Sequence, residues 1–339
     1  MYKAFIDSIE KLLKDSNLWD DNYKIIANPK RSGQSFCFFI YENGKKRMVA
    51  KFFDYLKGLN AITEFVNTDA FSTVDEYINS LDDSPIPYEL NKINEIVYYL
   101  KRSFDRYIDV TSNTEGLFPK VYAYSSNIKL INSFFGLLIE EAIDGETLES
   151  KHKKIKLDKV ENVNLSKSLL HSIGKTIKKY YEYGLVHRDL SPDNIMVTPN
   201  EKFVVIDPGT IKIINRDSTN YGYIMGKQIY ASPEQYYGNA CKADFSSDLY
   251  SLGIICYEMI TGINLIDKYL TQGSNRPHDN ILDKLDREVE DIFYEFCDEN
   301  NEKNILLFSV LKKMLQPENL YRFENVDSFL EALSTLGGE

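Results

Sequence analysis

Apolar residues recur at helical spacing near the N-terminus, with charged residues on the opposite side. This period predicts an amphipathic helix over residues 4–19. Its polar side is not basic, so we expect it to pack on the body of the protein and not on a membrane surface. The apolar positions are Phe5, Ile6, Ile9, Leu12 and Leu13.

The pattern changes to strands between residues 23 and 53. Two strand-like runs, 35–42 and 47–53, flank Asn43-Gly44, a residue pair that is typical of a tight hairpin turn. We therefore expect an antiparallel hairpin in this part of the chain.

Residues 54–87 are mixed and polar, which indicates an insertion, with a short helix near 58–66. A helical stripe follows at 88–104, directly after a proline. Two further strands are predicted at 118–124 and 134–139.

Beyond Gly145 the pattern becomes mainly helical, with helices predicted at 165–183 and 245–261 and a hairpin-like stretch at 194–214. Strands first and helices afterwards favour an α+β fold with segregated parts. The expected parts are an N-terminal helical extension at 1–22, a strand-rich part at 23–140 that carries the insertion 54–87, and a helical part at 141–339.

Composition adds constraints but no chemistry. Of the 339 residues, 43% are apolar and 27% charged, which are ordinary values for a globular protein. The net charge of −11 lacks the basic excess of nucleic-acid binders, so we expect no such partner. Four scattered cysteines without a C-x-x-C pair, no apolar run of membrane length and no signal pattern favour the cytoplasm.

Residues 186–194 concentrate candidate catalytic groups in the run Val-His-Arg-Asp-Leu-Ser-Pro-Asp-Asn. Phosphoryl transfer needs a group that orients the attacking hydroxyl, oxygen ligands for a divalent cation, and a cation on the phosphates. Asp189 suits the first task, and the amide oxygen of Asn194 suits the second. Taken alone, the same run would be a surface turn.

A second carboxylate follows an apolar strand, because Val204-Val205-Ile206 leads directly into Asp207. Magnesium is bound through one or two carboxylates together with phosphate oxygens. Asp207 is therefore the candidate metal ligand, with the end of a strand as its alternative, purely structural interpretation.

These motifs, with four others in the same order, resemble the signature set of protein kinases, in particular bacterial-type serine/threonine kinases. The resemblance runs from about residue 24 to the end of the chain. The further motifs are Met48-Val49-Ala50-Lys51, Ala231-Ser232-Pro233-Glu234, Ser247–Gly253, and Leu315-Gln316-Pro317 followed by Tyr321-Arg322-Phe323.

The resemblance implies a two-lobed kinase fold that uses ATP with Mg2+, or Mn2+ as an alternative, and a protein substrate. It implies that Lys51 contacts the α- and β-phosphates. It implies a buried pair between Glu234 and Arg322, and a structural role for Asp248.

By the same resemblance Arg188 receives a phosphorylated residue of the activation segment. Autophosphorylation there is one interpretation, and an unmodified loop is the other. The candidate acceptors are Ser218, Thr219, Tyr221 and Tyr223.

The nucleotide-binding residues follow from the resemblance less directly. Ser32, Gly33 and Ser35 stand in place of a loop that normally has three glycines. The hinge run 138–148 contributes Glu141 and Ile143, and whether Ile139 or Glu140 faces the adenine stays open. As the partner of Lys51 we favour Glu95 over Glu89, because Glu95 begins a run that is similar to the family's E-I-x-x-L.

Two departures from the family pattern concern the catalytic residues. Pro208 replaces phenylalanine after Asp207 and predicts a motif that rearranges less readily. Ser191 stands where serine/threonine kinases have lysine, and Lys227 stands where they have threonine. We interpret this as an exchange that keeps one cation beside Asp189, and the alternative is a solvated lysine on a mobile loop. Lys227→Ala should then cost far more activity than alanine at Lys212, which we expect to be exposed.

The leading hypothesis is an active protein kinase that is directed to serine or threonine. A pseudokinase or nucleotide-binding scaffold is the first alternative, supported by the altered glycine loop and Pro208. A small-molecule phosphotransferase of the aminoglycoside or choline kinase type is the second, disfavoured by the Ser-Pro-Glu motif and the helix that follows it.

Overall fold

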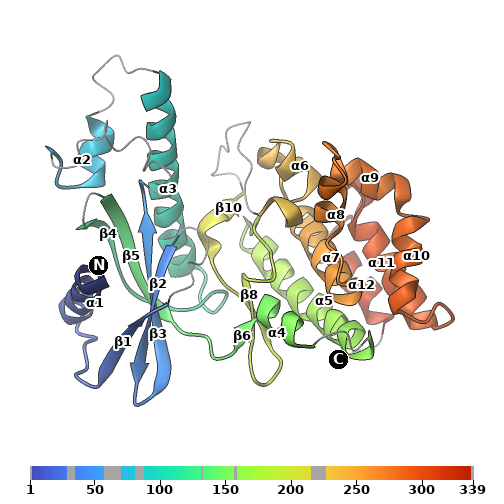
Figure 1. Cartoon of the computed structure of the whole chain (residues 1–339), viewed down its shortest axis with the longest axis horizontal. Helices are drawn as coiled ribbons and strands as arrows, with labels where there is room; N and C mark the ends of the chain where they lie inside the picture. The colour runs from blue at the N-terminus through green and yellow to red at the C-terminus, as the bar shows by residue number, and fades with distance from the viewer. Residues whose placement is uncertain are drawn as a thin grey trace. The chain divides into compact units, whose positions relative to one another are not determined.

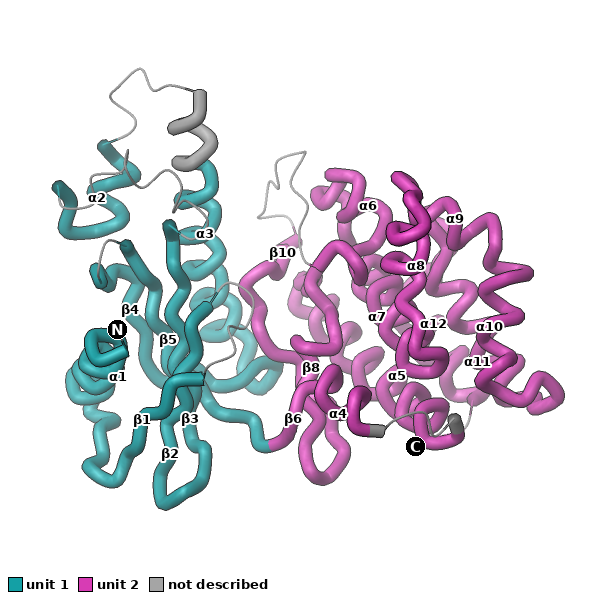
Figure 2. Tube along the Cα trace, viewed as in Figure 1, with its two compact units in different colours: residues 1–144 teal, residues 145–339 magenta. Residues whose placement is uncertain are grey.

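The computed structural model describes residues 2–28, 35–56, 70–80, 88–130, 133–155, 159–214 and 227–336. The chain divides into two compact units, Met1–Asp144 and Gly145–Glu339, shown in teal and magenta in Figure 2. Unit 1 holds an antiparallel sheet and unit 2 is mostly helical (Figure 1), which confirms the mixed α+β class.

Unit 1 is built on a five-stranded sheet with the strand order β1-β2-β3-β5-β4. Glu42 pairs with Lys45 across Asn43 and Gly44, and both turn residues have positive φ, at 50° and 79°. The predicted hairpin is therefore confirmed, with the turn type that such a residue pair favours. The strands are β1 (Tyr23–Ala27), β2 (Ser35–Glu42), β3 (Lys45–Asp54), β4 (Val121–Leu130) and β5 (Ser133–Glu141).

Helices pack on both faces of this sheet, since successive residues of a strand point to opposite faces. Helix α1 (Tyr2–Asp15) buries Phe5, Ile9 and Leu13 in a cluster that contains Phe135 and Leu137 of β5. Helix α3 (Tyr88–Asn113) packs on the other face, where Leu138 of β5 is buried. The first helix is thus a packed helix, as its non-basic polar face predicted.

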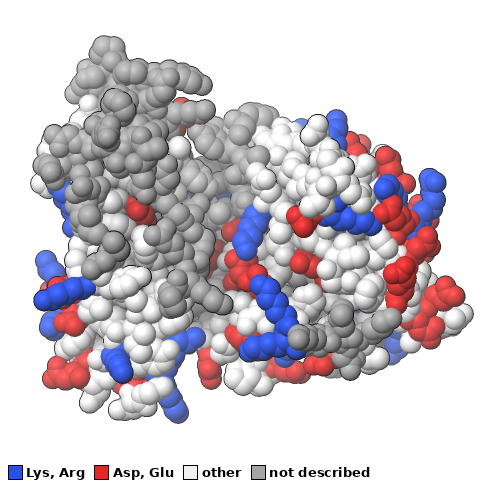
Figure 3. Space-filling view, viewed as in Figure 1, with Lys and Arg blue, Asp and Glu red and all other residues white. Residues whose placement is uncertain are grey.

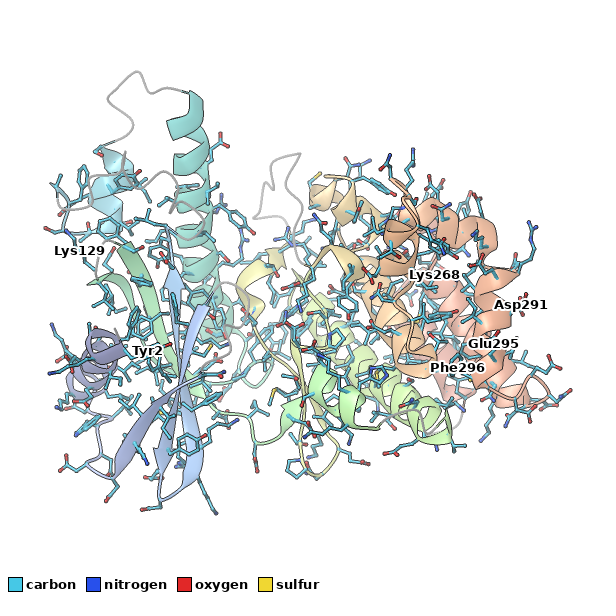
Figure 4. All side chains as sticks on the ribbon, viewed as in Figure 1. Tyr2, Lys129, Lys268, Asp291, Glu295 and Phe296 are labelled. Carbon is cyan, nitrogen blue, oxygen red and sulfur yellow. The ribbon has the colours of Figure 1, made fainter. Side chains whose placement is uncertain are left out.

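Helix α3 is longer than the apolar stripe at 88–104 predicted, since it continues to Asn113. The expected helix near 58–66 lies outside the described residues. Residues 70–80 contain a short helix, α2 (Val74–Asn79), whose first turn is capped by Thr73. The ammonium of Lys129, labelled in Figure 4, donates to the carbonyl of Phe71 at 2.9 Å and so ties this segment to the end of β4.

Unit 2 is organised around helix α7 (Phe245–Thr261), which matches the predicted 245–261 and is buried along almost its whole length. Asp244 and Ser247 form a capping box at its start, and Gly262 ends it with a φ of 72°. The other helices of four or more residues are α4 (Leu148–Ile155), α5 (Lys159–Glu182), α6 (Pro233–Tyr236), α8 (Leu265–Thr271), α9 (Pro277–Lys284), α10 (Glu288–Phe296), α11 (Glu302–Met314) and α12 (Val326–Ser334).

Short strands in unit 2 hold the segments that carry the candidate chemistry. A three-stranded sheet has the order β6-β8-β9, and β7 pairs with β10. The strands are β6 (Glu146–Thr147), β7 (Leu185–Val186), β8 (Ile195–Val197), β9 (Phe203–Val205) and β10 (Lys212–Ile213).

No single helix in the described part of the chain is long and apolar enough to cross a membrane. Among the described helices, one bent pair, α7 and α8, meets that test together, with an angle of 81° between the two helices. On the face that Figure 3 shows, the basic and acidic side chains of unit 2 are interspersed.

Gly136 lets α3 approach the sheet closely. A Cβ atom at this position would lie 2.6 Å from the ring of Phe104 and 2.5 Å from the hydroxyl of Tyr55. Both side chains are fully buried, so neither has space to move aside. The glycine is therefore a packing requirement of the face between β5 and α3.

We predict that Gly136→Ala lowers the free energy of unfolding of unit 1 by about 1–3 kcal/mol, the usual cost of overpacking. Chemical denaturation followed by fluorescence measures this change. Phe104→Leu removes part of the obstructing ring, so the double variant should lose less than the sum of the two single variants. Strict additivity would contradict the proposed clash.

Candidate active site

One carboxylate of α7, that of Asp248, anchors the loop at 187–194. The two oxygens of Asp248 accept hydrogen bonds from the backbone N–H groups of His187 and Arg188, each at 2.8 Å. Burial raises the pKa of Asp248 to about 7, although the two N–H groups act in the opposite direction. Asp248 is thus a structural residue that supports the loop, whereas the N-cap of α7 is Asp244.

Arg188 takes up a strained backbone conformation with a φ of 65°. Its carbonyl accepts a hydrogen bond from Gln235, and its Nε donates to the carbonyl of Thr210 at 2.8 Å. With the contact to Asp248, these bonds come from three segments of unit 2. The turn that presents the next residue, Asp189, is therefore held on several sides.

Asp189 and Asn194 lie in direct contact. The side-chain amide of Asn194 donates to the carbonyl and to the carboxylate of Asp189, both at 3.0 Å. With its NH2 group turned toward Asp189, the amide of Asn194 offers its oxygen as a ligand. Burial raises the pKa of Asp189 to about 7, against the N–H of Lys227 that donates to it at 2.9 Å.

Asp207 follows β9 directly and lies near the same end of the loop. The N–H of Ile206 donates to the carbonyl of Asn194 at 2.9 Å, which brings residues 194 and 207 together. Asp207 has a φ of 66°, and its side chain accepts from Gly209 at the start of the turn at Pro208–Thr210. A carboxylate and an amide oxygen form a hard oxygen donor set that fits Mg2+.

The ammonium of Lys227 lies 2.5 Å from the carboxylate of Asp193. The hydroxyl of Ser191 donates to the same oxygen of Asp193 at 2.8 Å. Asp193 therefore joins the two positions at which the sequence departs from the family pattern. Asp193 was not among the residues that the sequence pattern indicated, although its place beside Asn194 was a signal for it.

The Ala-Ser-Pro-Glu segment is held by a buried ion pair between Glu234 and Arg322. Their two contacts are parallel, at 2.9 and 3.0 Å, and the hydroxyl of Ser247 donates to the same carboxylate. Burial alone would raise the pKa of Glu234, but the guanidinium of Arg322 holds it below the usual value. This geometry fixes the segment to the start of α7 and to the C-terminal helices.

His278 supports the same segment and was missed by the sequence analysis. Its Nε2 lies 3.0 Å from the carbonyl of Ala231, and its ring packs against Tyr236 and Tyr250. Burial lowers the pKa of His278 to about 4. No spacing rule links residues 231 and 278, so only the fold could reveal this contact.

In unit 1 the ammonium of Lys51 forms an ion pair with Glu140 at 2.7 Å. The sequence favoured Glu95 as this partner, and that expectation is corrected here. Tyr107 of α3 contacts Lys51, and it lies about 18 Å along the helix axis from residue 95 at 1.5 Å per residue. Glu95 is instead on the exposed side of α3, while Glu89 belongs to the part of α3 whose side chains are not described.

The structure orients the two hinge residues that the sequence left open. Ile139 is buried in the cluster under α1, and Glu140 points to the α3 face with Lys51. Glu141 ends β5, and Ile143 follows it near the end of unit 1.

Several expected residues lie at or beyond the edge of what the structure describes. Ser35 begins β2 and pairs with Phe53. The expected loop residues Ser32 and Gly33 lie outside the described residues, as do the candidate phosphorylation sites Ser218, Thr219, Tyr221 and Tyr223.

We predict that His278 makes unit 2 less stable as the pH falls. The neutral ring is favoured in the folded state, so stability is full above about pH 6.5, the unfolded pKa of histidine, and is lost toward pH 4, by up to roughly 3 kcal/mol. His278→Gln keeps a hydrogen-bond donor without this titration. Its unfolding free energy should fall less than that of the wild type between pH 7 and 4.

Identical pH dependence in the two proteins would contradict this prediction. Comparison with the wild type is needed because other buried groups also titrate. Burial also lowers the pKa of His187 to about 4, whereas it raises the pKa values of Asp189 and Asp248.

Comparison with known proteins identifies the class of fold that carries this site. The chain is 34% identical over 128 residues to serine/threonine-protein kinase PknA of Mycobacterium tuberculosis, a match that covers 37% of this chain and 28% of PknA. It is 42% identical over 89 residues to serine/threonine-protein kinase pkn3 of Myxococcus xanthus, covering 24% of this chain and 16% of that protein.

A third relative, serine/threonine-protein kinase D of Synechocystis, is 30% identical over 152 residues, which cover 42% of this chain and 27% of that kinase. The sequence model of the protein kinase domain matches residues 108–328. That match contains every candidate residue of unit 2 and begins after Lys51. Since it spans more than half of the sequence, the chain belongs to the protein kinase domain family.

Proposed function

We propose that the chain is an ATP-dependent protein kinase that transfers the γ-phosphoryl group to a serine or threonine hydroxyl of a protein substrate. The observation that carries the proposal is the cluster of Asp189, Asn194 and Asp207 at one end of the anchored loop. The named serine/threonine kinases among its relatives support the substrate class.

In this proposal Asp189 accepts or orients the proton of the attacking hydroxyl. Asn194 and Asp207 hold Mg2+, with Mn2+ as an alternative, and Lys51 holds the α- and β-phosphates. When bound, the metal ion neutralises charge on the phosphate oxygens. The chain itself supplies position and charge, which is most of what phosphoryl transfer asks of a protein.

The segment around Glu234 favours a protein substrate over a small molecule. Its ion pair with Arg322, its bond to Ser247 and the support from His278 make it a fixed platform next to Asp189. A fixed segment of this kind can hold an extended protein substrate, whereas a small-molecule substrate does not need it. We therefore rank the aminoglycoside- or choline-kinase interpretation below the protein kinase.

Transfer of label from γ-labelled ATP tests the proposal directly. With Mg2+ present, the wild type should label itself or a generic protein substrate. Asp207→Asn keeps the shape of the side chain but removes its charge, so activity should fall at least about 100-fold, because a bound metal ion contributes several kcal/mol to transition-state stabilisation.

Three outcomes would contradict the proposal in different ways. Stabilisation by ATP without turnover would indicate a pseudokinase. Transfer to an aminoglycoside or choline, but to no protein, would indicate a small-molecule phosphotransferase. Equal activity in the wild type and Asp207→Asn would remove Asp207 from the metal site.

We further propose that Lys227 supplies a cation beside Asp189 that replaces the lysine absent at position 191. Lys227→Ala keeps the backbone contact to Asp189 and removes the long side chain with its ammonium. We expect kcat to fall about tenfold or more, as for a lost charged contact of about 1.5–3 kcal/mol. The double variant Ser191→Lys with Lys227→Thr should recover part of the activity.

Lys242→Ala is the matched control, because Lys242 is an exposed lysine of the same unit. Lys212 does not serve as one. It was expected to be exposed, but its ammonium donates to the carbonyls of Cys241 and Ala243. Unchanged kcat in Lys227→Ala would show that the lysine is merely solvated.

A further inference from the structure

Lys51 and Glu140 are brought together by the register of two neighbouring strands. In the antiparallel pair β3 and β5, Lys51 lies opposite Leu138, and Val49 lies opposite Glu140. Residues two apart on a strand share a face, so Lys51 and Glu140 are diagonal neighbours on the face that α3 covers. Their contact follows from sheet pairing and needs no helix to create it.

A tyrosine of α3 joins this pair, so that the three side chains make polar contacts with one another. The hydroxyl of Tyr107 donates to Oε2 of Glu140 at 2.5 Å, while Lys51 lies 2.7 Å from Oε1 of the same carboxylate. The ammonium of Lys51 also donates to the hydroxyl of Tyr107 at 3.3 Å and lies 5.5 Å from the centre of its ring. Both oxygens of Glu140 are therefore engaged.

All three side chains are buried. The exposed fractions are 6% for Lys51, 3% for Glu140 and 0% for Tyr107. Removing one charged partner of a buried pair leaves the other without compensation, which is strongly unfavourable. The Lys51 ammonium is thus held in one place by Glu140 and Tyr107, and loss of the Glu140 carboxylate would destabilise the fold.

We infer that Glu140 and Tyr107 are the positioning residues of Lys51, and that the carboxylate that orients this lysine belongs to the sheet instead of to α3. The inference deepens the proposed function, since it rests on Lys51 acting on the nucleotide phosphates. Among the described contacts of Lys51, the one from α3 is the neutral hydroxyl of Tyr107. Displacement of α3 would therefore leave the ion pair of Lys51 intact, and activity would not depend on a helix-borne carboxylate.

The ion pair itself is tested without any nucleotide. Trinitrobenzenesulfonate is a small amine-reactive compound that modifies lysine only in its deprotonated form. Peptide mapping measures the extent of modification of Lys51 as a function of pH. Glu140 favours the ammonium form, so Glu140→Gln should lower the pH of half-maximal modification by about one to three units. An unchanged profile for Lys51 would overturn the pairing.

The positioning role is tested by phosphoryl transfer in the same variants. Glu140→Gln should lower kcat/KM for ATP by about 10- to 100-fold, because small errors in the position of a catalytic group have costs of this size. Tyr107→Phe removes one neutral hydrogen bond, worth about a fivefold decrease. Tyr107→Phe also serves if Glu140→Gln fails to fold, as judged by thermal unfolding.

Two variants of α3 serve as controls. Asp105→Asn removes an exposed carboxylate that pairs with Lys101 at 2.6 Å, and Tyr98→Phe removes an exposed hydroxyl. Both should keep the activity of the wild type and the Lys51 modification profile. They separate the buried contacts from a general effect of changing the helix.

The results distinguish this inference from the proposed function. Equal or higher activity in Glu140→Gln would overturn the positioning role and indicate a restraint on Lys51. A shifted modification profile in a protein without any phosphoryl transfer would keep the ion pair but refute the kinase proposal. Loss of activity in Glu95→Gln to the same extent as in Glu140→Gln would also overturn the inference, since it would return the role to the helix.

Discussion

A charge that is removed from water must meet an opposite charge or a set of hydrogen bonds, and the candidate functional residues of each unit depend on this constraint. In unit 2 the carboxylate of Asp248 meets two backbone N–H groups, and Glu234 meets the guanidinium of Arg322. In unit 1 Lys51 meets Glu140. None of these groups could move far without leaving a buried charge uncompensated, so each one fixes the backbone that carries it.

The same constraint explains how chemistry is presented on otherwise ordinary elements. Because α7 is buried and firmly capped, Asp248 provides a stationary support for the positive-φ turn at Arg188. The side chains of Asp189 and Asn194 are then held in contact. The irregular backbone of this loop is therefore as well fixed in position as the backbone of a helix. In unit 1 the sheet itself performs this task, since strand register alone brings the Lys51 and Glu140 side chains to the same face.

The family, the fold class and the loop residues could be predicted because they depend on local spacing. The hairpin at Asn43-Gly44 and the helix at 245–261 follow from turn chemistry and period, and both are present. The partner of Lys51 could not be predicted, because the resemblance directed the choice to carboxylates of the helix, whereas the register of β3 and β5 places the partner on the sheet. His278 was missed because its partner, Ala231, is brought near only by the fold. Asp193 had a local signal in its place beside Asn194, but its contact with Lys227 is made only by the fold.

The most direct test of this account is a crystal structure of the chain with a non-hydrolysable ATP analogue and Mg2+. We expect Lys51 to contact a phosphate oxygen while Glu140 and Tyr107 still hold its ammonium. We also expect Asn194 and Asp207 to be ligands of the cation. A nucleotide bound away from these residues, or a Lys51 that has left Glu140 for a carboxylate of α3, would contradict this account.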